Sequence, residues 1–63
     1  MNKYRVIIIQ VDRLFGDCYY YAECVEAGSE AEAFEKGKQT ETFRRDDTSV
    51  INRIELIRKE VRG

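Results

Sequence analysis

The sequence predicts an α+β fold, a single domain over residues 1–63 with the element order β-β-α-β. Two segments rich in β-branched and aromatic residues lie close together and are separated by a short turn, which is typical of a hairpin. A capped and highly charged segment of helical character follows, and another apolar segment comes after it. A chain of 63 residues has room for one small domain with a thin core.

The first predicted strand runs from about Lys3 to Val11 and is apolar on both of its faces. Its centre, Val6 to Ile9, is a continuous β-branched run, so residues of both parities place apolar bulk on the sheet. A chain of this length with one obvious helix can cover only one of these faces. We therefore expect the other face to be left for a partner, for a second copy of the chain, or for long side chains that fold over it.

A turn and a second strand complete the predicted hairpin. Residues 12–17 (DRLFGD) combine an aspartate at each end with Gly16, which can adopt a positive φ. The second strand then runs from Cys18 to about Glu26, where three successive tyrosines and Val25 favour a pleated surface. Strands joined by so short a connection are expected to pair antiparallel.

A helix is predicted over about Glu30–Glu41. Ser29 stands at the N-cap position and Glu32 follows three residues later, which together indicate a capping box. Glu32 and Lys36 also make a favourable pair one helical turn apart. The predicted buried stripe is narrow and consists of Ala33, Phe34, Gly37 and Thr40. Because glycine is costly inside a helix, we expect Gly37 to permit a close approach of the helix to the sheet.

The last apolar segment, Val50–Val61, follows a polar loop at Thr42–Ser49 and has two interpretations. As a helix it would be capped by Ser49 and would bury apolar residues at helical spacing. As a strand it would join the hairpin, and we favour this because three strands are the usual minimum for a stable sheet. A right-handed crossover makes it parallel to the second strand. It then lies beside the first strand, which gives an antiparallel or mixed sheet of order 2-1-3 with the helix on one face.

Alternation along the strands separates a core set from an open set of side chains. We expect the helix-side core to contain Ile7, Ile9, Val11, Cys18, Tyr20, Ala22, Cys24, Phe34, Ile54 and Leu56. We expect the open face to carry Tyr4, Val6, Ile8, Gln10, Tyr19, Tyr21, Val25, Ile51 and Ile57. A single bulge would exchange the two sets, so the parity of the strands stays open.

Composition and motifs exclude several classes of function. Eleven Lys and Arg against twelve Asp and Glu give a formal net charge of -1, which argues against a general polyanion binder and against an acidic mimic of nucleic acid. The sequence has no histidine and no nucleophile elbow, P-loop or dinucleotide-binding motif, so we expect neither enzymatic activity nor a cofactor. A metal site is not expected either, because CxxC spacing is absent.

The two cysteines are interpreted as reduced side chains that pack like small apolar residues. On one strand, Cys18 and Cys24 would have Cα atoms roughly 20 Å apart at ~3.3 Å per residue, and a disulfide needs less than about 7 Å. The apolar run is too short for a secretory signal, and no stretch approaches the ~20 residues of a membrane span. We therefore expect a cytoplasmic protein that makes no contact with membranes.

Aromatic and basic residues are the candidates for contact with a macromolecular partner, because Tyr and Arg dominate protein–protein hot spots. In the turn, Leu14 and Phe15 either insert into a pocket of a partner or fold back over the core. The predicted partner-binding residues are Leu14, Phe15, Tyr19, Tyr21, Arg44, Arg45, Arg53 and Arg58. An alternative is a nucleic-acid-binding or regulatory module, in which tyrosines on the open sheet face stack on bases.

Two short segments, Val25–Ser29 and Asn52–Leu56, bracket the predicted helix. The pattern from Cys18 to Ile57 resembles small β-β-α-β proteins encoded by phages and plasmids, including some small anti-CRISPR proteins of the type I class. The resemblance implies a non-catalytic binder of host machinery, located in the host cell cytoplasm if a phage encodes it. We thus expect a protein that blocks a surface on a protein or ribonucleoprotein complex. Nucleic acid is less favoured as a partner, and a homodimer through the open sheet face is a further option.

Overall fold

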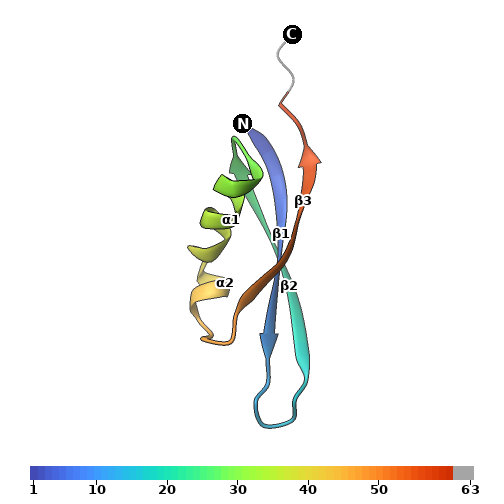
Figure 1. Ribbon diagram of the computed structural model, residues 1–63, viewed down its shortest axis with the longest axis vertical. Coiled ribbons are helices and arrows are strands. Elements are labelled where there is room, and N and C mark those ends of the chain that lie inside the picture. The colour runs from blue at the N-terminus through green and yellow to red at the C-terminus, as the bar shows by residue number, and fades with distance from the viewer. Residues whose placement is uncertain (61–63) are drawn as a thin grey trace.

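The computed structural model describes residues 1–60, which form three strands and two helices (Figure 1). The elements are β1 (Asn2–Val11), β2 (Cys18–Ala27), α1 (Glu30–Lys38), α2 (Glu41–Arg44) and β3 (Val50–Arg58). The strands form one sheet of order β2-β1-β3, in which β1 pairs antiparallel with both neighbours. The predicted α+β fold, the strand interpretation of the last apolar segment and the central place of the first strand are confirmed. Val61, which the sequence placed at the end of this strand, lies outside the described residues.

The beginning of α1 follows the predicted cap. The Ser29 hydroxyl oxygen accepts a hydrogen bond from the Glu32 N–H at 3.2 Å. The Glu32 carboxylate in turn accepts from the N–H of Gly28 at 3.2 Å and forms an ion pair with Lys36 at 3.2 Å. These contacts satisfy backbone donors that a helix N-terminus leaves unpaired, which explains why the helix begins here.

The single predicted helix over Glu30–Glu41 is wrong in its second half, because the chain forms two helices. The Thr40 hydroxyl donates to the carbonyl of Gly37 at 2.7 Å and accepts from the N–H of Phe43 at 3.3 Å. Thr40 therefore closes α1 and caps α2, which occupies part of the segment that we expected to be a loop. A threonine at the end of one helix can serve as the N-cap of the next. We expected Thr40 inside a single helix and did not predict its role as a cap.

Gly37 permits the close approach of α1 to the sheet that its position predicted. A Cβ atom at Gly37 would lie 2.7 Å from Cγ1 of Val6 and 3.3 Å from Cδ1 of Ile51. Only a residue without a side chain fits at this distance. α1 thus packs across all three strands and covers one face of the sheet, which both helices share (Figure 1).

The parity of β1 and β2 is the reverse of the expected one. Tyr4 packs in a buried cluster with residues of α1 and of its entry turn, and Val6 lies against Gly37. Alternation along β1 places Ile8 and Gln10 on the helix side as well. The residues on this side are thus those that we assigned to the open face: Tyr4, Val6, Ile8, Gln10, Tyr19, Tyr21, Val25 and Ile51. The side chains now on the opposite face were expected in the core: Ile7, Ile9, Val11, Cys18, Tyr20, Ala22 and Cys24.

On β3, Ile54 and Leu56 lie on the helix side as expected, opposite Val6 and Tyr4. A register shift between Ile7 and Ile8 brings Ile51 to the same side.

Polar pairing explains which parity is chosen. Gln10 is buried, and its side-chain amide donates to the Thr42 carbonyl at 2.7 Å and to the Ser49 hydroxyl at 3.1 Å. Glu23 accepts a hydrogen bond from the Thr42 hydroxyl on the same side. β1 carries apolar side chains on both faces, so burial of apolar surface does not determine which face packs against the helices. The hydrogen-bond partners that α2 and the following loop offer to Gln10 and Glu23 determine it.

Seven of the ten side chains that we expected to pack in the core are exposed: Val11, Cys18, Tyr20, Ala22, Cys24, Phe34 and Leu56. Cys18 and Cys24 are free and solvent-exposed, because the reversed parity turns them away from the helices. Phe34 is 40% exposed, and the Lys38 ammonium lies 4.9 Å from the centre of its ring. The expectation that the cysteines are not bonded to each other is confirmed, but their packing as buried apolar residues is wrong.

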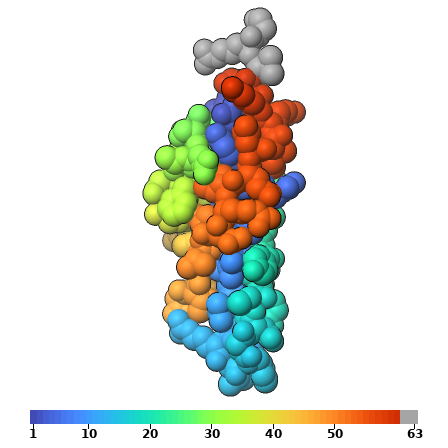
Figure 2. Space-filling view, turned by 45° about the vertical axis from the view of Figure 1, so that its right-hand side comes forward, coloured from blue at the N-terminus to red at the C-terminus, as the bar shows by residue number. Residues whose placement is uncertain are grey.

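The molecule is a rod, with extents of 51 × 16 × 14 Å (Figures 1 and 2). Its radius of gyration is 13.0 Å, whereas a compact domain of this length has about 10.6 Å. The long axis follows the β1–β2 hairpin, which continues past Val50, where the pairing of β3 with β1 begins at Ile9. The end of the hairpin therefore projects beyond both helices.

Candidate functional site

The hairpin tip is a turn whose backbone is fixed by one aspartate. The carboxylate of Asp12 accepts hydrogen bonds from the N–H groups of Leu14 at 2.9 Å and Phe15 at 3.4 Å. The Asp12 carbonyl accepts from the Gly16 N–H at 2.6 Å, and Gly16 has a φ of 74°. The side chains of Leu14 and Phe15 are 81% and 75% exposed. They project from the tip, so the alternative that they fold back over the core is wrong.

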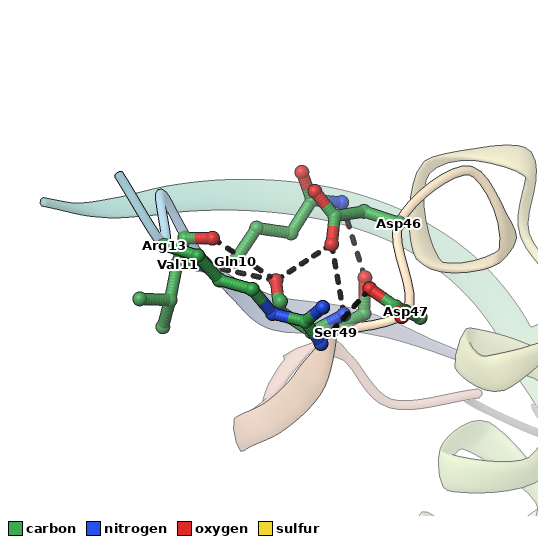
Figure 3. A network of polar contacts seen from close by, with 7 residues as sticks. Gln10, Val11, Arg13, Asp46, Asp47 and Ser49 are labelled. Atoms are coloured by element: carbon green, nitrogen blue, oxygen red, sulfur yellow. Dashed lines mark hydrogen bonds and ion pairs between the residues drawn. The ribbon is translucent and has the colours of Figure 1, made fainter. Parts of the chain in front are cut away.

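A polar network centred on Thr48 joins the foot of the tip to the α2–β3 loop. Figure 3 shows this network from close by. The Thr48 hydroxyl oxygen accepts from the N–H of Val11 at 2.9 Å and lies 2.6 Å from the carboxylate of Asp46. The N–H of Thr48 donates to the same Asp46 oxygen at 2.8 Å. Arg13 forms an ion pair with Asp47 at 3.2 Å. β3 does not pair with β1 beyond Ile9, so the side chain of Thr48 supplies the hydrogen-bond partner that a neighbouring strand would give to Val11. The loop thereby stabilises the base of the hairpin.

An open groove of about 560 Å³ lies between the hairpin and this loop. Tyr19 and Tyr21 of β2 line it together with Leu14 of the tip, and residues 46–48 line it from the loop side. The Arg45 guanidinium lies 4.8 Å from the centre of the Tyr21 ring, a cation–π arrangement that orders both side chains. Three aspartates and one arginine line the groove, so its charge is net acidic.

The structure brings together five of the eight predicted partner-binding residues. Leu14, Tyr19 and Tyr21 line the groove, Phe15 stands beside Leu14 on the tip, and Arg45 covers Tyr21. Arg44 ends α2 next to Arg45, and the two line a second hollow with Gln39 and Glu41. The other two lie apart from this group: Arg53 in an ion pair with Glu55 at 3.1 Å on β3, and Arg58 opposite Lys3 at the far end of the sheet.

Sequence reasoning did not select Arg13 and Thr48, which hold the foot of the tip. The run of residues 46–49 (DDTS) carried a usable signal, because an aspartate two residues before a threonine commonly forms an Asx turn. The structure contains this turn, in which Asp46 accepts from the N–H of Thr48.

The second uncovered surface is the sheet face opposite the helices, which we call the open face. Its centre is apolar, and Ile7 is only 8% exposed, between Ala22 of β2 and Arg53 of β3. Glu55 bridges two arginines at its rim, with Arg5 at 3.2 Å and Arg53 at 3.1 Å. The open face is defined by Arg5, Ile7, Ile9, Val11, Cys18, Tyr20, Ala22, Cys24, Val50, Arg53 and Glu55. In residues 1–60, no strand or helix covers this face.

The electrostatics of the hairpin foot favour a charged Asp46. The hydrogen bonds from the hydroxyl and N–H of Thr48, assisted by Arg13 and Arg45, hold the pKa of the Asp46 carboxyl below its ordinary value of 3.8. At Glu55, the hydrogen bonds from Arg53 and Arg5 likewise lower the pKa of the carboxyl below 4.5. A carboxyl whose pKa is lower in the folded than in the unfolded state stabilises the fold above the unfolded value, and this stabilisation is lost as the pH falls through the folded value.

Removing the Thr48 hydroxyl is expected to raise the pKa of Asp46 toward 3.8, because the strongest contact that favours its charged form is lost. The measurement is an NMR titration of carboxyl groups in the wild type and in Thr48→Val. The stability of Thr48→Val should also fall less steeply as the pH is lowered below 3.8. The pKa of Glu32, which is lowered by the Gly28 N–H and Lys36 at the other end of the molecule, is the internal control. An unchanged pKa of Asp46 would contradict the network in Figure 3.

The carboxylates at the hairpin end are held by contacts within the protein. Asp46 accepts hydrogen bonds from Thr48, and Asp47 forms an ion pair with Arg13. Both carboxylates therefore stabilise the α2–β3 loop and its contact with the hairpin. Within residues 1–60, no group of three or more Cys, Asp and Glu residues is placed to hold a metal ion. Neither helix of this part of the chain is long and apolar enough to span a membrane.

Comparisons with protein-family models, with curated protein sequences and with solved structures find no match for this chain.

Proposed function

We propose that this protein is a non-catalytic binding protein that blocks a surface on a partner protein by inserting its hairpin tip. One observation carries the proposal: Leu14 and Phe15 are 81% and 75% exposed on a turn whose backbone is already fixed by Asp12. Large apolar side chains at the far end of a projecting hairpin add nothing to the core. Their burial in an apolar pocket would gain free energy, and little backbone entropy would be lost because the turn is preorganised.

Charge around the tip defines the chemistry of the partner surface. Asp12 and Asp17 flank the two apolar residues, and Asp46 and Asp47 lie at the foot beside Arg13. An acidic surround is complemented by a basic rim on the partner. The proposed contact is therefore an apolar pocket with Lys or Arg residues around its mouth.

The same features favour a protein partner over nucleic acid. Phosphate groups are repelled by a net acidic groove. The alternative function requires several tyrosines on one sheet face to stack on bases. Tyr20 lies on the open face, whereas Tyr19 and Tyr21 lie on the helix side. Base stacking by several tyrosines on one sheet face is therefore the less favoured function.

The resemblance to small type I anti-CRISPR proteins suggests which partner to test first. A type I surveillance complex has to bind target DNA, and proteins neutralise DNA phosphates with Lys and Arg. If the partner is such a complex, addition of the protein should prevent binding of target DNA or recruitment of the nuclease. Inhibition should saturate at a fixed ratio of protein to complex, because occupation of a surface is stoichiometric.

Truncation of the tip separates this proposal from its alternatives. Phe15→Ala and Leu14→Ala are each expected to weaken partner binding at least tenfold, since anchors of this kind cost about 2 kcal/mol or more. The thermal stability of both variants should match that of the wild type, because neither side chain packs in the core. Ile57→Ala is the matched control, since Ile57 is another exposed apolar residue but lies on β3 at a distance from the tip.

Binding assays with the surveillance complex, or with a host protein recovered by the wild type and lost by Phe15→Ala, decide the matter. A partner that is retained equally by Phe15→Ala and Ile57→Ala would exclude the tip as the contact. Inhibition at substoichiometric amounts would show turnover and contradict a non-catalytic function. Tight, salt-sensitive binding to free DNA or RNA would favour the nucleic-acid alternative.

A further inference from the structure

The two edges of the sheet differ in how they are protected against pairing with another strand. β3 contains two register shifts against β1 and carries Arg53 and Arg58. Bulges and basic residues are the usual means by which proteins block an edge. β2 pairs with β1 over ten consecutive residues without a register shift, and it contains no Lys, Arg or Pro. Apart from its end at Glu26, the edge of β2 is therefore a long and regular pairing surface.

We infer that β2 pairs antiparallel with β2 of a second copy of this chain, about a two-fold axis at Tyr21, to form a six-stranded sheet. This surface is separate from the hairpin tip, so the inference does not depend on the proposed function. The paired segment runs from Cys18 to Cys24 in each copy, which leaves Leu14 and Phe15 outside the interface. The open faces of the two copies lie on the same side of the joined sheet.

One end of the β2 edge is already occupied, and this limits the register. The Lys36 ammonium of α1 donates a hydrogen bond to the carbonyl of Glu26. A partner strand that extended to Glu26 would compete with this contact. With the axis at Tyr21, Glu26 lies opposite the turn residue Gly16 of the second copy, so the strand of that copy has already ended. Among the two-fold registers that keep the hydrogen bond from Lys36 to the Glu26 carbonyl, this one pairs the largest number of residues.

The side chains are self-complementary in this register. Directly opposed residues of antiparallel strands lie on the same face, so Tyr20 stands opposite Ala22 of the second copy, and the same large-to-small contact occurs twice. Glu23 stands opposite Tyr19, so no two carboxylates face each other. A shift of the axis to Glu23 would place this glutamate opposite its own copy, which is unfavourable.

The cysteines report the register directly. With the axis at Tyr21, Cys18 of each copy lies opposite Cys24 of the other, and opposed Cα atoms of antiparallel strands are about 4.5–5.5 Å apart, within the range of a disulfide. Within one copy the two cysteines are roughly 20 Å apart along β2 and cannot join. Both are free and exposed, so they are accessible to an oxidant.

The first experiment oxidises the purified protein with diamide, a diazene that takes up the two protons and two electrons released when two thiols form one disulfide. We expect a covalent dimer on a non-reducing gel, and we expect peptide mass spectrometry to identify Cys18–Cys24 links. Cys18→Ser and Cys24→Ser should each cross-link far less, because like cysteines do not face each other. A mixture of all three pairings in equal amounts indicates random collision and would overturn the inference.

The second experiment does not use the cysteines. Ala22→Lys places two lysines diagonally across the axis, about 7–8 Å apart, and should weaken the dimer at least tenfold in analytical ultracentrifugation. Ala22→Ser at the same position and Asn52→Lys on the β3 edge are the controls and should leave the dimer unchanged. Circular dichroism checks that each variant is folded, and if Ala22→Lys is not, the cross-linking result decides. A wild type that stays monomeric at the highest soluble concentration, or a dimer that is insensitive to Ala22→Lys, would contradict the inference.

Discussion

Replacing Ile8 by alanine is expected to lower the free energy of unfolding by about 3 kcal/mol, because Ile8 is one of the two large side chains that are completely buried. Ile9→Ala removes the same atoms one residue further along β1, on the open face, where the side chain is only partly buried. We expect this neighbouring substitution to cost less than half as much, since its surroundings can adjust and water already reaches it. Urea denaturation of the two variants measures the difference.

This pair of isoleucines tests the orientation of the whole sheet. The sequence favoured Ile9 as the helix-side residue, and the structure places Ile8 there. A larger loss of stability in Ile9→Ala than in Ile8→Ala would mean that β1 faces the helices with the opposite parity. The tip, the groove and the open face would then have to be reassigned together.

Gly37→Leu is expected to destabilise the fold by about 3 kcal/mol, at the upper end of what overpacking costs. Its first added atom alone would lie 2.7 Å from Val6 in the fully buried layer between α1 and the sheet. Gly37→Ala should be intermediate. Alanine gains about 1 kcal/mol of helix propensity, and the displacement of Val6 should outweigh this gain. Thermal and urea denaturation of the series would give the order glycine, alanine, leucine from most to least stable.

The control for helix propensity is Ala31→Gly, an exposed position in the same helix. It should cost about 1 kcal/mol, as glycine does in an exposed helix. A Gly37→Ala variant that is more stable than the wild type would show that α1 can move away from the sheet without penalty. The close approach would then not be required for the packing of this core.

Elements whose signals are local were predictable from the sequence. The Ser29 cap, the turn with Gly16 and the close approach at Gly37 each depend on one residue whose chemistry has few alternatives. The order of the strands followed from connection rules. The parity did not, because Val6 to Ile9 is apolar on both sides and carries no information about which side is covered. The deciding contact, between Gln10 and the Thr42 carbonyl, joins residues 32 positions apart.

The candidate site was predictable by residue type but not by arrangement. Leu14 and Phe15 could be selected because large apolar residues in a polar turn are conspicuous. The meeting of Tyr21 with Arg45 depends on the place of α2 beside the hairpin, and α2 exists because Thr40 caps a second helix. Arg53 and Arg58 were selected on the same grounds as Arg45, but they lie on β3, at the sheet edge opposite β2.

The projection of the hairpin beyond the helices separates the positions that determine folding from those that we propose for contact with a partner. The buried residues of the core lie beside α1, whereas Leu14 and Phe15 are held only by the Asp12 turn and by the Thr48 foot. Substitutions of Leu14 and Phe15 are therefore expected to change the free energy of unfolding very little. Two residues can be exchanged for a different apolar shape while the scaffold stays intact. If the tip is the contact that we propose, loop grafting should retarget the same rod, with Asp12, Gly16 and Thr48 as the positions to keep.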